Sequence, residues 1–168
     1  MRYVGIDPST KTGLVILERN GDILNKEEIY AIGAKNDPKT LITLTNDVLS
    51  YLNKDDKICI EGFSYGSTGR AVDFQYGLGW KIRTTLYEKG MKYVEVSPGG
   101  IKKFATSTGR IKKENMILPI FKRWGFEHDS DNVRDAFVIA QIARALNEEI
   151  ELTKFQKEVL EVLKKWRK

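Results

Sequence analysis

The sequence has 168 residues, of which 41% are hydrophobic, enough for one domain with a single core that needs no metal or disulfide support. Its only cysteine, Cys59, excludes an internal disulfide, and its only histidine, His128, leaves too few ligands for a structural zinc site. A net charge of +5 suits an anionic partner such as nucleic acid, although a basic protein with an ordinary solvated surface would look the same. No stretch approaches the roughly 18 apolar residues of a membrane span, so we expect one cytoplasmic domain, residues 1–168, without membrane contact.

The N-terminal third predicts a three-stranded antiparallel meander. Residues 2–7 and 14–19 are β-rich runs separated by a polar turn, and a third strand is expected over 22–31. The pair Asn20-Gly21 between the second and third runs favours a tight hairpin.

The middle of the chain alternates helices with strands. Helices are predicted over 38–52 and 69–89, because apolar residues recur there at helical spacing. These residues are Leu41, Leu44, Val48 and Leu52 in the first helix, and Phe74, Leu78, Ile82 and Leu86 in the second. Residues 57–63 read as a strand with apolar character on both faces, as expected inside a sheet covered by helices, and residues 92–98 as the last strand.

Helical segments dominate the last third. Short helices are expected over 100–106 and 111–124, and a longer one over 131–147 with Ser130 as its N-cap. Thr153 and Gln156 form a capping box that begins a terminal helix. The resulting order, β-β-β-α-β-α-β followed by helices, predicts an α/β protein with a mixed sheet flanked by helices.

Acidic residues stand where two predicted strands end. Asp7 follows the first strand and Glu61 lies at the end of KICIE, so parallel, adjacent strands about 4.8 Å apart would bring both carboxylates to one sheet edge. Asp131, Asn132 and Asp135 have the spacing of one helix face. Up to five oxygen ligands could therefore converge.

Such a cluster favours metal-dependent chemistry. Crowded carboxylates repel one another by several kcal/mol at low effective dielectric, and hard oxygen ligands select Mg²⁺ or Mn²⁺. Two such ions can hydrolyse a phosphodiester. The alternatives for single residues are a turn residue at Asp7 and a helix N-terminal acid at Asp131, whereas Glu61 after a buried run would be costly to bury unpaired.

Four segments together resemble the RuvC family of Holliday junction resolvases. They are GIDPSTKTG (5–13), CIEGF (59–63), VSPGGIKK (96–103) and DNVRDAFVIA (131–140). The resemblance implies a ribonuclease H-like mixed five-stranded sheet flanked by helices, of the phage type, that cuts branched DNA, above all Holliday junctions, as a homodimer with two Mg²⁺ or Mn²⁺ ions per site. The first segment alone is also similar to a phosphate-binding turn of actin-like ATPases.

Individual residues acquire roles from this resemblance. Asp7, Glu61 and Asp135 match its metal-binding acids, and Lys102 and Lys113 match two lysines near the scissile phosphate. Lysines in such a basic segment are otherwise usually solvated. Further candidates for DNA contact are Phe63, Tyr65, Arg70, Lys103, Arg110 and Lys112.

The aromatic residues after Glu61 have two interpretations. The resemblance places there an aromatic side chain that stacks at the junction centre, and Tyr65, deeper in a Gly/Ser-rich stretch, suits this better than Phe63. Packing in the core is the alternative. The resemblance also implies that the helix over about 70–89 forms the dimer interface.

Asn132 departs from the family pattern, which has an acid or histidine three residues before the final aspartate. An amide oxygen can bind a metal but brings no charge, so a second ion should bind more weakly. Either Asp131 replaces Asn132 as the metal ligand, or the chain is a catalytically inactivated form of the nuclease. We prefer the second interpretation.

Three other functions compete with junction resolution. A relaxed nuclease for forks and flaps would have the same active site, and a non-catalytic branch-binding protein would explain Asn132. An actin-like phosphotransferase lacks room in 168 residues for the second domain that closes over ATP.

Overall fold

The computed structural model describes residues 1–33, 38–64 and 72–166, and their centre is a five-stranded sheet in the order β3-β2-β1-β4-β5. The strands are β1 (Tyr3–Asp7), β2 (Lys11–Leu17), β3 (Ile23–Tyr30), β4 (Lys57–Glu61) and β5 (Tyr93–Val96). β1 to β3 form the predicted antiparallel meander, while β4 and β5 run parallel to β1. The mixed sheet expected from the sequence is confirmed.

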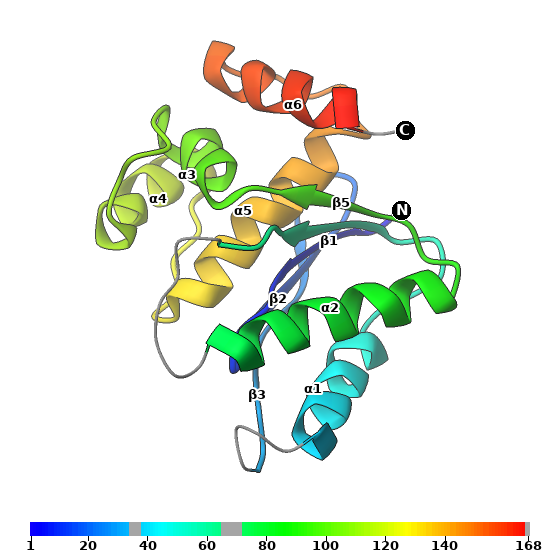
Figure 1. Ribbon diagram of the computed structural model, residues 1–168. Coiled ribbons are helices and arrows are strands. Elements are labelled where there is room, and N and C mark those ends of the chain that lie inside the picture. The colour runs from blue at the N-terminus through cyan, green and yellow to red at the C-terminus, as the bar shows by residue number, and fades with distance from the viewer. Residues whose placement is uncertain (34–37, 65–71, 167–168) are drawn as a thin grey trace.

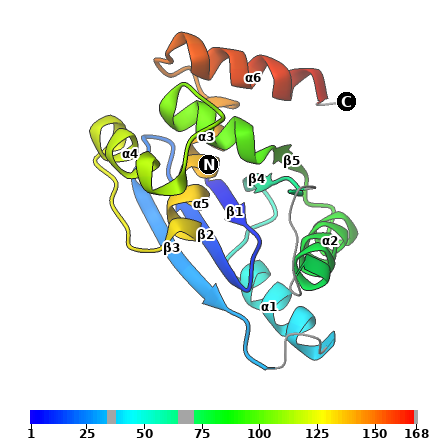
Figure 2. The same ribbon diagram turned by 60° about the vertical axis from the view of Figure 1, so that its left-hand side comes forward.

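Helices cover both faces of this sheet (Figure 1, Figure 2). They are α1 (Pro38–Ser50), α2 (Val72–Glu88), α3 (Pro98–Thr106), the 3₁₀ helix η1 (Lys113–Met116), α4 (Ile117–Trp124), α5 (Asp131–Ala145) and α6 (Lys154–Trp166). One hydrophobic cluster joins α1 and α2 to one face, and a larger one joins α3, α4, α5 and α6 to the other. In the described part of the chain, no helix is long and apolar enough to cross a membrane.

Strand alternation decides which side chains face α5. Along β1 and β4, the residues packed towards α1 and α2 are Val4, Ile6, Ile58 and Ile60, and those in the α5 cluster are Tyr3 and Cys59. Asp7 and Glu61 continue the second series, because side chains two positions apart share a face of a strand. Both carboxylates therefore project towards α5.

Two glycines let α5 lie directly on the sheet. A Cβ atom at Gly5 would lie 2.0 Å from the carbonyl oxygen of Ala136, and one at Gly13 would lie 2.1 Å from that of Asn132. Any larger residue would push the helix outward. The close contact keeps the N-terminal half of α5 beside the end of β1, where Asp7 lies.

The β2–β3 connection differs from the expected tight hairpin. It spans residues 18–22, with Gly21 at φ +98° donating its N–H to the carbonyl of Glu18, and Glu18 donating to that of Asp22. A register shift between Ile16 and Leu17 accompanies it. Asn20-Gly21 thus marks the turn correctly, but the two-residue geometry is wrong because the strands separate earlier.

Most helix ends agree with the sequence. Ser130 caps α5 by accepting a hydrogen bond from the Val133 N–H at 3.3 Å, and the Thr153 N–H donates to the Gln156 side chain at 3.0 Å before α6. The predicted helix over 111–124 divides into η1 and α4. Residues 69–71 of the predicted second helix lie outside the described residues.

Candidate active site

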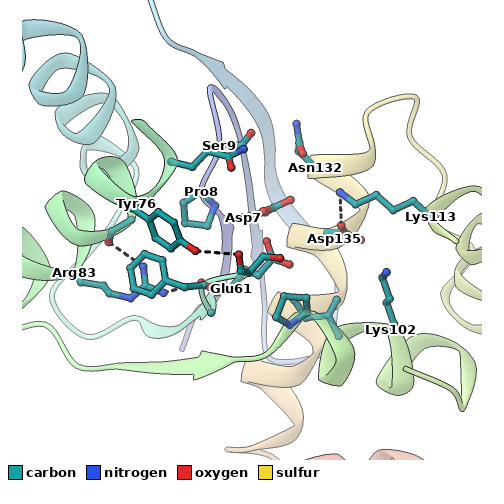
Figure 3. A pocket seen from close by; sticks show the side chains of 17 residues that line it. Asp7, Pro8, Ser9, Glu61, Tyr76, Arg83, Lys102, Lys113, Asn132 and Asp135 are labelled. Carbon is teal, nitrogen blue, oxygen red and sulfur yellow. Dashed lines mark hydrogen bonds and ion pairs between the residues drawn. The ribbon is translucent and has the colours of Figure 1, made fainter. Parts of the chain in front are cut away.

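A pocket of about 310 Å³ lies where β1 and β4 end, opposite the first turns of α5 (Figure 3). Its charged and amide side chains are Asp7, Glu61, Gln75, Arg83, Lys102, Lys113, Asn132 and Asp135. Asp7, Glu61 and Asp135 point towards one another, and the two lysines approach from the side of α3 and η1. Three carboxylates far apart in the sequence thus meet, as predicted.

Asp7 and Glu61 are neighbours because they directly follow Ile6 and Ile60, which pair in the parallel β1–β4 ladder. Asp7 is only 3% exposed, and its Oδ2 atom has no hydrogen-bond partner among the described residues. Burial, then the charge of Glu61, raises the pKa of Asp7 well above its usual value. Burial likewise raises the pKa of Glu61. The charge of Asp7 is therefore poorly compensated, whereas the charges of Lys113 and Lys102 partly offset the burial of Glu61.

Asp135 lies on α5 and is held by a single lysine. The ammonium of Lys113 lies 3.0 Å from Asp135 Oδ2 and 2.9 Å from Asp131 Oδ2. Burial raises the pKa of Asp135 despite this contact. At the more exposed Asp131, burial is outweighed by the hydrogen bond from Lys113, and the pKa is lowered. Asp131 does not line the pocket, so it is less well placed than Asp135 to bind a metal there.

Asn132 lines the pocket and lies near an acid on β3, Glu28, that the sequence pattern did not single out. The Glu28 carboxylate accepts hydrogen bonds from the hydroxyls of Ser130 and Tyr30, both at 2.5 Å, and these contacts lower the pKa of Glu28. The Asn132 side chain contributes to lowering the pKa of this carboxylate. Strand alternation could have indicated this position. Glu28 pairs with Gly13 across the β2–β3 ladder, and α5 lies directly over Gly13, so the Glu28 side chain is placed beside the start of α5.

The donor set suits a hard divalent cation. In residues 1–33, 38–64 and 72–166, no three acidic, histidine or cysteine side chains form a ready metal cage. The carboxylates of Asp7, Glu61 and Asp135, with the amide oxygen of Asn132, are nevertheless the ligand type that Mg²⁺ and Mn²⁺ prefer. The unpartnered oxygen of Asp7 and the ammonium at Asp135 indicate that this cluster requires positive charge.

The basic candidates divide into two groups. Lys102 on α3 and Lys113 line the pocket, and Arg110 and Lys112 are exposed in the segment that leads from α3 to η1. Lys103 is engaged elsewhere, because its ammonium lies 2.7 Å from Glu158 of α6.

The aromatic candidate Phe63 packs on α2. Its ring centroid lies 5.4 Å from that of Tyr76 and 5.3 Å from that of Trp80. Phe63 is half-buried at the mouth of the same pocket and belongs to neither core cluster, so it is not the core residue of the packing alternative, and stacking on DNA stays a prediction. Tyr65 and Arg70 lie outside the described residues.

Arg83 also lines the pocket, at 2% exposure, and the sequence reasoning did not select it. It follows Ile82 of the apolar stripe, and Gly79 lies one helical turn before it. The sequence signal for Arg83 is its position four residues after Gly79 and next to the buried Ile82, because a glycine one turn away leaves space for a buried arginine side chain.

Comparison with known proteins supports one fold. Neither the protein-family models nor the curated proteins give a match. A structure of Thermus thermophilus RuvC is similar at a TM-score of 0.65 and 18% identity, covering 83% of this chain and 91% of that one. T. thermophilus RuvC in complex with Holliday junction substrate is similar at 0.61 and 20% identity, covering 83% and 90%. The chain therefore has the RuvC-type, ribonuclease H-like fold.

Proposed function

We propose that the protein is an endonuclease that cleaves branched DNA, chiefly four-way Holliday junctions, using two Mg²⁺ or Mn²⁺ ions per site. The observation that carries this proposal is the convergence of Asp7, Glu61 and Asp135 with two lysines in one pocket of a RuvC-type fold. The related T. thermophilus protein has been solved with a Holliday junction, which supports branched DNA as the ligand here.

The acids would hold the metal from three directions. Asp7 and Glu61 offer oxygens from adjacent strand ends, Asp135 from α5, and Asn132 an uncharged oxygen from the preceding turn. When bound, divalent ions supply activation of a water and stabilisation of the leaving oxygen in phosphodiester hydrolysis. Because burial disfavours charge on all three acids, a cation and the loss of their protons favour each other.

The two lysines of the pocket would stabilise negative charge on the phosphodiester. Lys102 and Lys113 approach the carboxylates from one side, so a phosphodiester bound there would have ammonium groups near the oxygens that gain charge in the transition state. Without DNA, Lys113 neutralises Asp131 and Asp135 instead. Arg110 and Lys112 extend the positive surface for sequence-independent backbone contact.

Cutting two symmetric strands of a junction suits a C₂ dimer. α2 presents an exposed stripe at helical spacing, formed by Trp80 at 58% exposure, Thr84 and Tyr87 at 83%. Large aromatic residues exposed on one helix face favour an interface there. Tyr87→Glu should then shift the sedimentation coefficient from dimer to monomer.

The test is cleavage of a labelled four-way junction, a fork and a linear duplex with the same arm sequences, with Mg²⁺ or Mn²⁺ and at fixed salt. We expect metal-dependent cutting, weak in the parent because of Asn132, stronger in Asn132→Asp and fastest on the four-way junction. In the Asn132→Asp background, cutting should be lost in Glu61→Gln and kept in the charge-matched control Glu149→Gln, which changes an exposed residue after α5. Equal rates on fork and junction would support the relaxed nuclease instead.

One observation favours a second candidate, a non-catalytic branch-binding protein. Asn132 brings no charge to the pocket, and Lys113 already neutralises Asp135. This candidate predicts selective binding of the four-way junction with no cutting at any metal concentration.

A further inference from the structure

Arg83 of α2 connects three elements through one buried guanidinium. Its Nε donates to Glu95 Oε2 of β5 at 2.7 Å, its Nη1 to the carbonyl of Gly79 at 2.9 Å, and its Nη2 to the carbonyl of Glu61 at 2.7 Å. All three nitrogens are used, which the rigid fork of arginine allows and the single ammonium of lysine does not.

The same guanidinium packs against the Phe63 ring and forms one wall of the site that holds it, which we call the Phe63 seat. Its Cζ atom lies 4.2 Å from the centroid of the Phe63 ring, in a cation–π contact. Gly79 completes the seat, because a Cβ atom there would lie 2.6 Å from Phe63 Cε1. Tyr76 and Trp80 flank the ring. Arg83 thus touches residues on both sides of Gly62, the main chain of Glu61 and the ring of Phe63.

A purely structural role explains this arrangement poorly. α2 is already attached to the sheet by an apolar stripe, whose members are Phe74, Leu78, Ile82 and Leu86. Burying a guanidinium carries a desolvation cost, and a well-packed apolar residue often serves stability as well or better. The contacts of Arg83 are instead concentrated at the pocket, which it lines together with Glu61 and Phe63.

We propose that Arg83 is a positioning residue that fixes the direction of the Glu61 carboxylate and of the Phe63 ring together, and so couples metal binding to recognition of branched DNA. The proposal rests on the proposed function for its DNA part. Its geometric part stands on the contacts of Arg83 alone.

The experiment compares Arg83→Met, which keeps an apolar stem, with Arg83→Lys, which keeps the charge but loses the fork. Arg2→Met is the matched control, because Arg2 also pairs with an acid, the buried Asp56, at 3.1 Å, but at the opposite end of the sheet. The readouts are the unfolding midpoint, calorimetric Mg²⁺ affinity without DNA, and the ratio of four-way junction to duplex affinity with Ca²⁺.

A fourth readout follows the Phe63 seat directly. In a monomeric background with Tyr87→Glu, Trp124→Phe and Trp166→Phe, Trp80 is the one remaining tryptophan of the three, and its acrylamide quenching reports how well Phe63 covers it. We expect Arg83→Met to increase quenching, to weaken Mg²⁺ binding several-fold and to lower the junction preference at least about fivefold. Arg83→Lys should give quenching, Mg²⁺ affinity and junction preference between those of Arg83→Met and the parent. Arg2→Met should lower only the unfolding midpoint.

A lower midpoint in Arg83→Met with unchanged Mg²⁺ affinity, quenching and junction preference would overturn the proposal, as would full function in Arg83→Lys. If Arg83→Met does not fold, Glu95→Gln and Arg83→Lys give the same comparison in milder form. A parent without junction preference would refute the proposed function, while quenching and Mg²⁺ affinity would still decide whether Arg83 positions Phe63 and Glu61.

Discussion

The two ends of the central strands differ in the partners that surround a buried acid. Before β4, Asp56 is 7% exposed but lies 3.1 Å from Arg2 and accepts a hydrogen bond from the Asn53 N–H at 2.8 Å. At the other end of β1, Asp7 is equally buried, has an oxygen without a partner in the described part of the chain, and adjoins further acids.

Burial raises the pKa of both acids, but at Asp56 the charge of Arg2 and the Asn53 N–H act against the rise, whereas at Asp7 the neighbouring acids add to it. Asp56 has its own cation, whereas Asp7, Glu61 and Asp135 share the pocket with Lys113, which directly contacts only Asp135. Such a cluster costs stability in the metal-free protein, a pattern typical of functional sites. Removing an acid should therefore have opposite effects at the two ends.

The largest expected effect is on cleavage by Glu61→Gln, measured in the Asn132→Asp background. Loss of a charged metal ligand should slow cutting by at least about a thousandfold, since several kcal/mol of transition-state stabilisation are removed. Junction binding should stay near the parent level. The unfolding midpoint of the metal-free variant should rise, because a repelling charge is removed.

Asp56→Asn is the opposite control. It should keep the cleavage rate and lose about 2 to 3 kcal/mol of unfolding free energy, because Arg2 loses its partner. If both variants lose stability alike, the two ends of the sheet do not differ as described.

The next effect in size is on Asn132. Asn132→Asp adds a charge beside the metal and should raise metal-dependent cleavage by about tenfold or more, the equivalent of 1.36 kcal/mol. The new carboxylate would face Glu28, so Glu28→Gln in the same chain should restore stability lost to repulsion.

Single-turnover rates decide between the interpretations of Asn132. Equal cutting by the parent and Asn132→Asp, together with loss of cutting in Asp131→Asn, would make Asp131 the working ligand. The inactivated-form hypothesis would then be wrong.

A smaller effect should follow removal of the shared lysine. Lys113→Met frees Asp135 from a competing ammonium, so calorimetric Mg²⁺ affinity should rise about three- to tenfold while cleavage slows. Lys103→Met, which removes an ion pair with Glu158, should leave both unchanged. An unchanged Mg²⁺ affinity in Lys113→Met would show that the ammonium and the metal do not compete.

The smallest effect is a pH dependence of stability. The folded metal-free protein retains protons on Asp7 and Glu61 at pH values where the unfolded chain has lost them, because both pKa values are raised. Raising the pH through that window therefore lowers the free energy of unfolding. Mg²⁺ replaces those protons, so its stabilising shift of the midpoint should be larger at about pH 8 than at about pH 5.5. Asp7→Asn should flatten this dependence.

The sequence predicted the sheet and the acidic site because both follow from local patterns. Strand alternation and strand ends place Asp7 and Glu61, and helical spacing places Asp135. The contacts of Glu28 and Arg83 could not be predicted in the same way, since they depend on the β2–β3 register and on how α2 crosses the end of β4. The seat of Phe63 also needed the missing side chain of Gly79, which is read as a helix-weakening residue in the sequence.

In the proposed site, a divalent ion bound by Asp7, Glu61 and Asp135 replaces the contact between Lys113 and Asp135. The most direct measurement is a crystal structure with Mn²⁺, with the anomalous signal locating the ion. We expect an anomalous peak bounded by oxygens of Asp7, Glu61 and Asp135, with the Lys113 ammonium moved away from Asp135. An empty pocket at saturating Mn²⁺, with Lys113 still paired to Asp135, would contradict it.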